Sequence, residues 1–169
     1  LGPEERVLEV SRRKSEAVAT SFEGELVLGA DTIVVVDGEV LEKPANQEDA
    51  VRMLRQLSGR GHRVYTGMTL IESGRDRSGE DVAVTDVSLR RLSDEDIDRY
   101  LAVGESMDKA GAYAAQGVAG MFVESVSGCF YNVVGLPLAC LWGLLEERLG
   151  QSPWSLIPGD APGSGSARF

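Results

Sequence analysis

A carboxylate inside an apolar run is the feature that most limits how this chain can fold. Residues 26–36, LVLGADTIVVV, have the composition of a buried strand, yet Asp31 and Thr32 lie within the run. Burying a carboxylate among β-branched side chains is costly unless a cation, a metal or several hydrogen-bond donors compensate it. Either Asp31 faces a functional site, with Lys43 as a candidate partner, or it caps a turn before a strand that begins at Ile33.

The segment before this strand has helical spacing. A helix is expected from Pro3 to about Phe22, and its predicted inward stripe is Val7, Val10, Ala17, Val18 and Ser21. Lys14 falls on the same stripe. It either points toward the surface on which the helix packs, or lays its stem on apolar surface and extends its ammonium into solvent.

The remaining patterns predict an alternation of strands and helices. Turn signals and capping residues predict a hairpin at Asp37-Gly38 with a return strand at 39–42, and then a helix from the N-cap Asn46 to Gly59. An antiparallel strand pair follows at 62–71 and 81–89, joined by a loop at 73–80, and then a helix from the Ser93–Asp96 capping box to Gly104. The rest is predicted as a loop with a functional role at 107–117, a strand at 120–127, a connection at 128–135, and a last helix that begins at Pro137 and buries Leu138, Leu141, Trp142, Leu145 and Leu149.

Composition narrows the class of protein. The chain has 169 residues, which suits one domain, here 1–150, with a Pro-, Gly- and Ser-rich tail over 151–169 that we expect to be disordered. A net charge of −10 argues against a polymeric nucleic-acid partner, since affinity for phosphate backbones needs clustered Lys and Arg. No apolar run reaches the ~18 residues that cross a bilayer. Cys129 and Cys140 form no CxxC pair, which favours reduced thiols in a cytoplasmic setting over zinc or disulfides.

Four blocks of sequence together resemble the Maf family. They are ADTIVVVDGEVLEKP from Ala30, LRQLSGRGHRVYTGMTL from Leu54, MDKAGAYAAQG from Met107 and NVVGLPL from Asn132, in the family's order and spacing. The resemblance implies an α/β fold like that of the inosine triphosphatases, a mixed twisted sheet flanked by helices with two lobes around a central cleft. It also implies hydrolysis of nucleoside triphosphates to the monophosphate and pyrophosphate with a divalent metal, Mg or Mn, and a possible homodimer.

The resemblance assigns roles to five residues. Asp31 matches the family's catalytic carboxylate, which activates water or holds it near the metal. Lys14 and Lys43 match lysines that face the triphosphate, and Thr32 and Gln116 match positions linked to the choice of base. The form DKAGAY..QG resembles the branch that acts on dTTP and UTP. A glutamine amide can both donate and accept hydrogen bonds, which suits a uracil or thymine edge, although a surface amide in a loop is the alternative for Gln116.

One departure from the family pattern raises a second hypothesis. Maf proteins open with a strand and a Ser-x-Ser-Pro-Arg-Arg segment, then an acidic residue that helps to hold metal. Ser11, Arg12 and Arg13 only echo this motif, without its proline and in mid-helix. The chain begins at Leu1, so a fragment or processed product is expected, and losing an arginine clamp would weaken phosphoryl transfer. The alternatives to an active pyrophosphatase are a nucleotide-binding or partner-binding remnant and, with little weight, an unrelated acidic scaffold.

The only histidine invites a catalytic assignment that we decline. His62 lies at the entrance of a predicted strand, where a structural hydrogen bond is the more frequent role. Ser58, Arg60 and Thr66 are interpreted as turn and strand residues, with Arg60 and Thr66 kept open as neighbours of the cleft.

Overall fold

The computed structural model describes residues 1–156, with a five-stranded sheet as its frame. The strands are β1 (Leu26–Val36), β2 (Glu39–Leu41), β3 (Gly61–Glu72), β4 (Ser78–Leu89) and β5 (Val123–Ser127), in the order β2-β1-β3-β4-β5. Every neighbouring pair is antiparallel in the described part of the chain, whereas the resemblance implied a mixed sheet. The predicted α/β class with helices flanking a sheet is confirmed.

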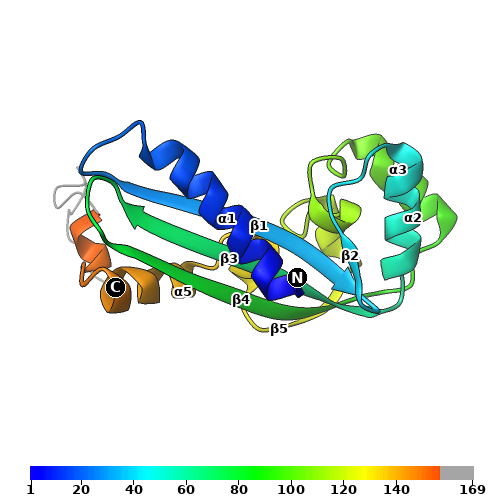
Figure 1. The fold of residues 1–169 in the computed structure, drawn as a ribbon. Coiled ribbons are helices and arrows are strands. Elements are labelled where there is room, and N and C mark those ends of the chain that lie inside the picture. The colour runs from blue at the N-terminus through cyan, green and yellow to red at the C-terminus, as the bar shows by residue number, and fades with distance from the viewer. Residues whose placement is uncertain (157–169) are drawn as a thin grey trace, which may run out of the picture.

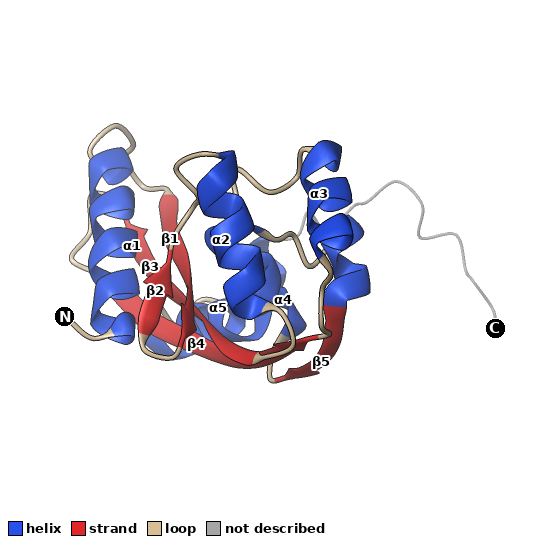
Figure 2. Cartoon of the chain, turned by 90° about the vertical axis from the view of Figure 1, so that its right-hand side faces the viewer, coloured by secondary structure: helices blue, strands red, loops and turns tan. Residues whose placement is uncertain are grey.

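Helices surround this sheet on both faces and at one end (Figures 1 and 2). The α-helices are α1 (Pro3–Ala19), α2 (Gln47–Leu57), α3 (Asp94–Val103), α4 (Phe130–Val134) and α5 (Leu138–Gly143). Shorter turns are the 3-10 segments η1 (Ala110–Ala112), η2 (Val118–Phe122) and η4 (Pro153–Leu156), and a π-helical turn, η3 (Leu144–Arg148). None of the described helices is long and apolar enough to cross a membrane.

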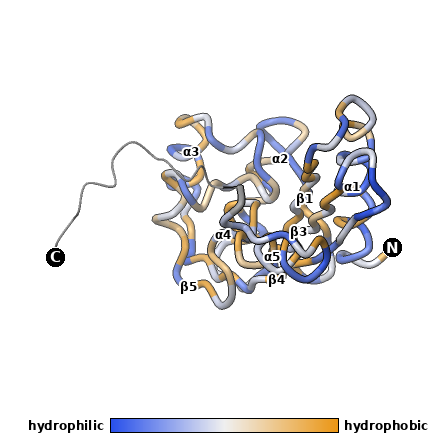
Figure 3. Tube along the Cα trace, turned by 90° about the vertical axis from the view of Figure 1, so that its left-hand side faces the viewer, coloured by the Kyte–Doolittle hydropathy of each residue, from blue (hydrophilic) through white to orange (hydrophobic). Residues whose placement is uncertain are grey.

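The largest apolar core lies between the sheet and α2, α3, η1 and η2. Val34, Val64 and Val87 supply its sheet side, and Leu54, Leu57 and Tyr100 are among its fully buried members from the helices. Figure 3 shows the division of hydropathy, with orange along β1 and β3 and blue over much of α1. The predicted N-caps of α2 and α3 are present. The Asn46 side chain accepts a hydrogen bond from the Asp49 backbone amide, and Ser93 and Asp96 form a capping box.

Two glycines let α1 lie directly on the sheet. A Cβ at Gly67 would come within 2.5 Å of the Val7 carbonyl carbon, and one at Gly29 would clash with the Ser11 carbonyl oxygen. Such a close approach also requires small residues on the helix, and the buried positions of α1 are Val7, Ser11 and Ser15.

The predicted stripe of α1 is therefore wrong in its C-terminal part, although Val10 is half-buried. Ala17, Val18 and Ser21 are exposed, because α1 ends at Ala19 and a serine face, which hydropathy does not reveal, meets the sheet. The Ser11 hydroxyl shows how this polar face is satisfied: it bonds the Leu8 carbonyl at 2.9 Å and the Thr69 hydroxyl at 2.8 Å.

The C-terminal third differs from its prediction in several places. The strand expected at 120–127 begins at Val123, after the 3-10 turn η2, and the connection at 128–135 contains α4. In the last helix Leu145 and Leu149 are buried as predicted, but Leu138 and Trp142 are 46% and 38% exposed. The π-helical turn η3 rotates the apolar face within that helix, which accounts for this mismatch.

The boundaries of two other predicted segments also change. β4 begins at Ser78, so the loop after β3 is shorter than expected. The predicted tail begins with residues that the structure describes: Pro153–Leu156 form a 3-10 turn, and the Trp154 ring packs edge-on against Trp142 with centroids 5.5 Å apart. The rest of that prediction, residues 157–169, lies outside the described residues.

Candidate functional site

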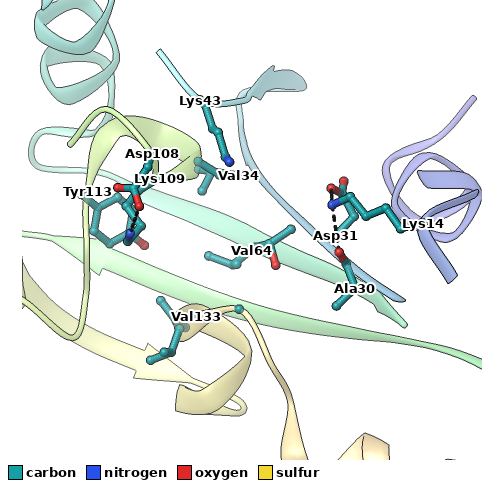
Figure 4. Close-up of a pocket in the computed structure, with 14 residues that line it drawn as sticks. Lys14, Ala30, Asp31, Val34, Lys43, Val64, Asp108, Lys109, Tyr113 and Val133 are labelled. Carbon is teal, nitrogen blue, oxygen red and sulfur yellow. Dashed lines mark hydrogen bonds and ion pairs between the residues drawn. The ribbon is translucent and has the colours of Figure 1, made fainter. Parts of the chain in front are cut away.

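A cavity of about 200 Å³ opens at the edge of β1 (Figure 4). Residues Asp31 and Thr32 are adjacent in this strand, so their side chains point to opposite faces of the sheet, yet both line the cavity. The topology explains this: β2 pairs only with Val34–Val36, so in the described structure β1 has a single neighbour, β3, at Asp31. The cavity therefore wraps around a strand edge and receives side chains from both faces.

On the α1 side of the strand, Asp31 forms an ion pair with Lys14. The Lys14 ammonium lies 2.7 Å from Asp31 Oδ1 and donates a second bond, of 2.9 Å, to the Ala30 carbonyl. The Lys14 side chain is 52% exposed and that of Asp31 21%, so the pair remains accessible to a ligand. Of the two interpretations given for each residue, the structure supports the one in which Asp31 faces a site and Lys14 points toward the sheet.

On the opposite face, Thr32 begins a polar chain that holds the far wall in place. Its hydroxyl bonds that of Thr66 at 2.8 Å, and the Thr66 hydroxyl lies 3.4 Å from the Asn132 carbonyl. The fully buried Asn132 side chain donates to the Val64 carbonyl at 3.0 Å and to Thr85 Oγ1 at 2.9 Å. These bonds fix α4 against the sheet, and with it residues 133–135, which line the cavity.

Lys43 contributes a positive charge from the chain that leaves β2. Its ammonium points into the cavity between Val34 and Asp31 (Figure 4). Within residues 1–156 it forms no hydrogen bond and no ion pair, so its charge is available to a ligand. An unpaired ammonium beside the Lys14–Asp31 pair makes this end of the cavity attractive to anions.

The segment expected at 107–117 supplies site residues that sequence reasoning did not single out. Asp108, Lys109 and Tyr113 line the cavity across from Asp31. The Lys109 ammonium lies 2.6 Å from Asp108 Oδ2, and this hydrogen bond, helped by the charge of Lys43, lowers the pKa of the Asp108 carboxyl. The signal that could have found them is the charged pair immediately before a run of Gly and Ala residues.

Not every predicted residue joins this cavity. Asp31, Thr32, Lys14 and Lys43 are brought together, whereas Gln116 is exposed in a turn of the same segment and does not line it. Arg12 forms a bidentate pair with Glu80 and Arg13 pairs with Glu9, so neither lines the cavity, as expected for residues that only echo the family's motif. Arg60 pairs with Asp37 outside the cavity.

His62 lies behind the cavity wall and not in it. The side chain is buried and bonds the Tyr113 hydroxyl through Nε2 at 2.8 Å, and its ring meets the Tyr113 ring edge-on at 5.4 Å. Burial lowers the pKa of His62 from 6.5 to about 4 and raises the pKa of Tyr113. A neutral, inward-facing imidazole supports the structural role predicted for it.

The residues that line the cavity suit a metal ion bound together with phosphate better than a metal ion held by protein ligands alone. The described residues contain no group of three or more His, Cys, Asp or Glu side chains that could hold an ion. Asp31 is one accessible carboxylate in a cavity with room for an anion, and Mg²⁺ commonly binds through one or two carboxylates and the phosphates of its substrate.

Fold and cavity together define an α/β protein with a lysine-lined cavity at a strand edge, and comparison with known sequences gives the family. The profile described as "Maf-like protein" matches residues 1–148. The dTTP/UTP pyrophosphatase of Thermococcus onnurineus is 50% identical over 148 residues, which cover 88% of this chain and 79% of that protein. The dTTP/UTP pyrophosphatase of Syntrophomonas wolfei is 47% identical over 146 residues, covering 86% of this chain and 77% of the relative. The chain belongs to the Maf family.

The buried imidazole leads to a measurable pH dependence. Because the pKa of His62 in the folded protein is about 4, against 6.5 for the free side chain, the unfolded chain binds the extra proton between these values. The contribution of His62 to stability is complete above pH 6.5 and is lost as the pH falls toward 4. NMR titration of this histidine should show a neutral ring down to about pH 5. A midpoint at 6.5 in the folded protein would place the ring in solvent and contradict the packing described.

Proposed function

We propose that this chain hydrolyses nucleoside triphosphates, dTTP and UTP preferentially, to the nucleoside monophosphate and pyrophosphate. The observation that carries the proposal is an accessible carboxylate on a strand, Asp31, that shares a cavity with three lysines in a chain about 50% identical to proteins named dTTP/UTP pyrophosphatase. The charges suit the reaction, in which a water molecule must be oriented and the negative charge on the phosphoryl oxygens neutralised.

In the proposed mechanism Asp31 and the two lysines have different roles. Asp31 accepts a proton from the attacking water and orients it toward the α-phosphorus. Lys14 and Lys43 donate hydrogen bonds to phosphate oxygens, and Lys14 can do so without leaving Asp31, because its ammonium has three hydrogens. The water oxygen forms a bond to phosphorus as the bond to the bridging oxygen breaks, and pyrophosphate leaves. A divalent cation, Mg²⁺ or Mn²⁺, held by Asp31 would neutralise further charge when bound.

Two further properties are proposed. One is assembly into a homodimer, on the family resemblance, and the other is residence in the cytoplasm, on the two cysteines that form no CxxC pair. Neither is needed for the arrangement of the cavity, which is formed within one chain.

Replacing the carboxylate tests the proposal. Asp31→Asn keeps the size of the side chain but removes the base and the charge that pairs with Lys14, so pyrophosphate release from dTTP with Mg²⁺ should fall by about 10²- to 10⁴-fold. Asp86→Asn is the matched control: Asp86 also pairs with a cation on a strand, Arg63, but is exposed and does not line the cavity. Wild-type turnover in the Asp31 variant would refute the assignment. Wild-type protein that binds dTTP and releases no pyrophosphate would favour the nucleotide-binding remnant.

Gln116 is retained as a proposed determinant of base choice, on the resemblance. Since it lies outside the lining of the cavity, a contact with the base would require its turn to move on binding. Gln116→Ala should then lower kcat/KM for dTTP and UTP more than for purine triphosphates, measured over a panel of nucleotides. Equal rates for purine and pyrimidine triphosphates with the wild-type chain would exclude this role.

A further inference from the structure

The cavity has a second ion pair at the end opposite Asp31, and the Maf resemblance assigned no individual role to its two residues. We propose that Asp108 and Lys109 recognise the hydrogen-bonding edge of the substrate's pyrimidine base. This inference rests on the proposed function, because it names the part of the nucleotide that binds there. Figure 4 shows the geometry behind it, with Asp31 and Lys14 on one side, Asp108 and Lys109 on the other, and Lys43 between them.

The backbone around the pair is held in an unusual and well-anchored conformation. Gly111 and Ala112 both have positive φ, 69° and 60°, and Ala112 is fully buried. A left-handed alanine is uncommon and persists only where its surroundings enforce it. Gly111 donates to the Glu42 carbonyl at 3.1 Å, one residue before Lys43, so the Asp108–Lys109 pair has a fixed position relative to the phosphate end.

The surface between the two charged ends is apolar. Val34, Val64 and Val133 line it, and Tyr113 closes the far side with its ring held by His62. Such a surface suits a planar ring and gives no hydrogen bond to phosphate oxygens. The base therefore belongs between the valines and the second ion pair, with the triphosphate at Lys14 and Lys43.

The ion pair retains hydrogen-bonding capacity after its own bond is made. A carboxylate has about four lone-pair sites and an ammonium three hydrogens, and one of each is used in the 2.6 Å contact. In uracil and thymine a carbonyl oxygen, O4, lies beside an N3–H donor, so the ammonium can donate to O4 while the carboxylate accepts from N3. Cytosine presents the reverse pattern, an amino group beside an unprotonated N3, and would place a donor against the ammonium.

The Asp108–Lys109 pair carries no net charge, so a phosphate group gains less there than beside the unpaired Lys43. The Asp108 carboxyl has a lowered pKa and stays ionised at neutral pH, so its negative charge opposes that of a phosphate group. The Lys109 side chain is 43% exposed and that of Asp108 70%, so both can be reached by a ligand.

Binding of nucleotide fragments tests the inference without requiring turnover. Isothermal titration with Mg²⁺ present would compare dTMP, which carries the base, with inorganic tripolyphosphate, which carries only the charge. Lys109→Met should weaken dTMP binding about tenfold and change tripolyphosphate binding less than about twofold, because the lost bond is to the base. Lys43→Met is the matched control, with the opposite pattern expected. The preference for dTMP over dCMP should fall toward one in Lys109→Met.

The outcomes separate this inference from the function on which it rests. A Lys109→Met protein that loses tripolyphosphate affinity as strongly as Lys43→Met, or that keeps wild-type dTMP affinity and preference, would overturn the base-reading role. If Lys109→Met does not fold, Asp108→Asn provides the same comparison, since it removes the carboxylate acceptor and should also reduce the dTMP to dCMP preference. A wild-type chain that binds dTMP selectively but releases no pyrophosphate would overturn the proposed function and leave the base-reading role in place.

Discussion

The candidate site depends on one electrostatic contact, the pairing of the Asp31 carboxylate with the Lys14 ammonium at 2.7 Å. A carboxylate in a strand of β-branched residues needs a cation, and the cation can arrive only if α1 lies close to the sheet. The absence of side chains at Gly29 and Gly67 and the serine face of α1 allow that approach. The packing of the first helix and the chemistry of the cavity are therefore two consequences of the same short stretch of sequence.

Local patterns predicted the elements that form this frame. The apolar run with Asp31, the Asp37-Gly38 turn and the capping residues Asn46 and Ser93 each act over a few residues, and the structure has the predicted strand, hairpin and helices there. The face of α1 could not be predicted in the same way. Ser11 and Ser15 are buried because glycines far along the chain leave room for them, which is a tertiary effect that hydropathy does not record.

The candidate site was likewise predictable from the sequence only in part. Asp31 could be predicted as a site residue because it interrupts an apolar strand. Lys14 and Lys43 could be predicted because a buried carboxylate needs a cation and because both match lysines of the family. Asp108 and Lys109 interrupt nothing in the sequence, since a charged pair in a small-residue loop has the appearance of a solvated turn. Only the fold, through the left-handed turn at Gly111 and Ala112 and its bond to Glu42, brings that pair opposite Asp31. Gln116 is the opposite case, because the resemblance assigned it to the site and the structure places it on an exposed turn.

The central claim is that the carboxylate and lysines at the edge of β1 direct water to the α-phosphorus of a bound nucleotide. The most direct measurement is ³¹P NMR of the products that the wild-type chain forms from dTTP in ¹⁸O-labelled water with Mg²⁺. The account predicts equal amounts of pyrophosphate and dTMP, with the label in dTMP, as attack at the α-phosphorus requires. Inorganic phosphate with dTDP, or label in pyrophosphate, would contradict it.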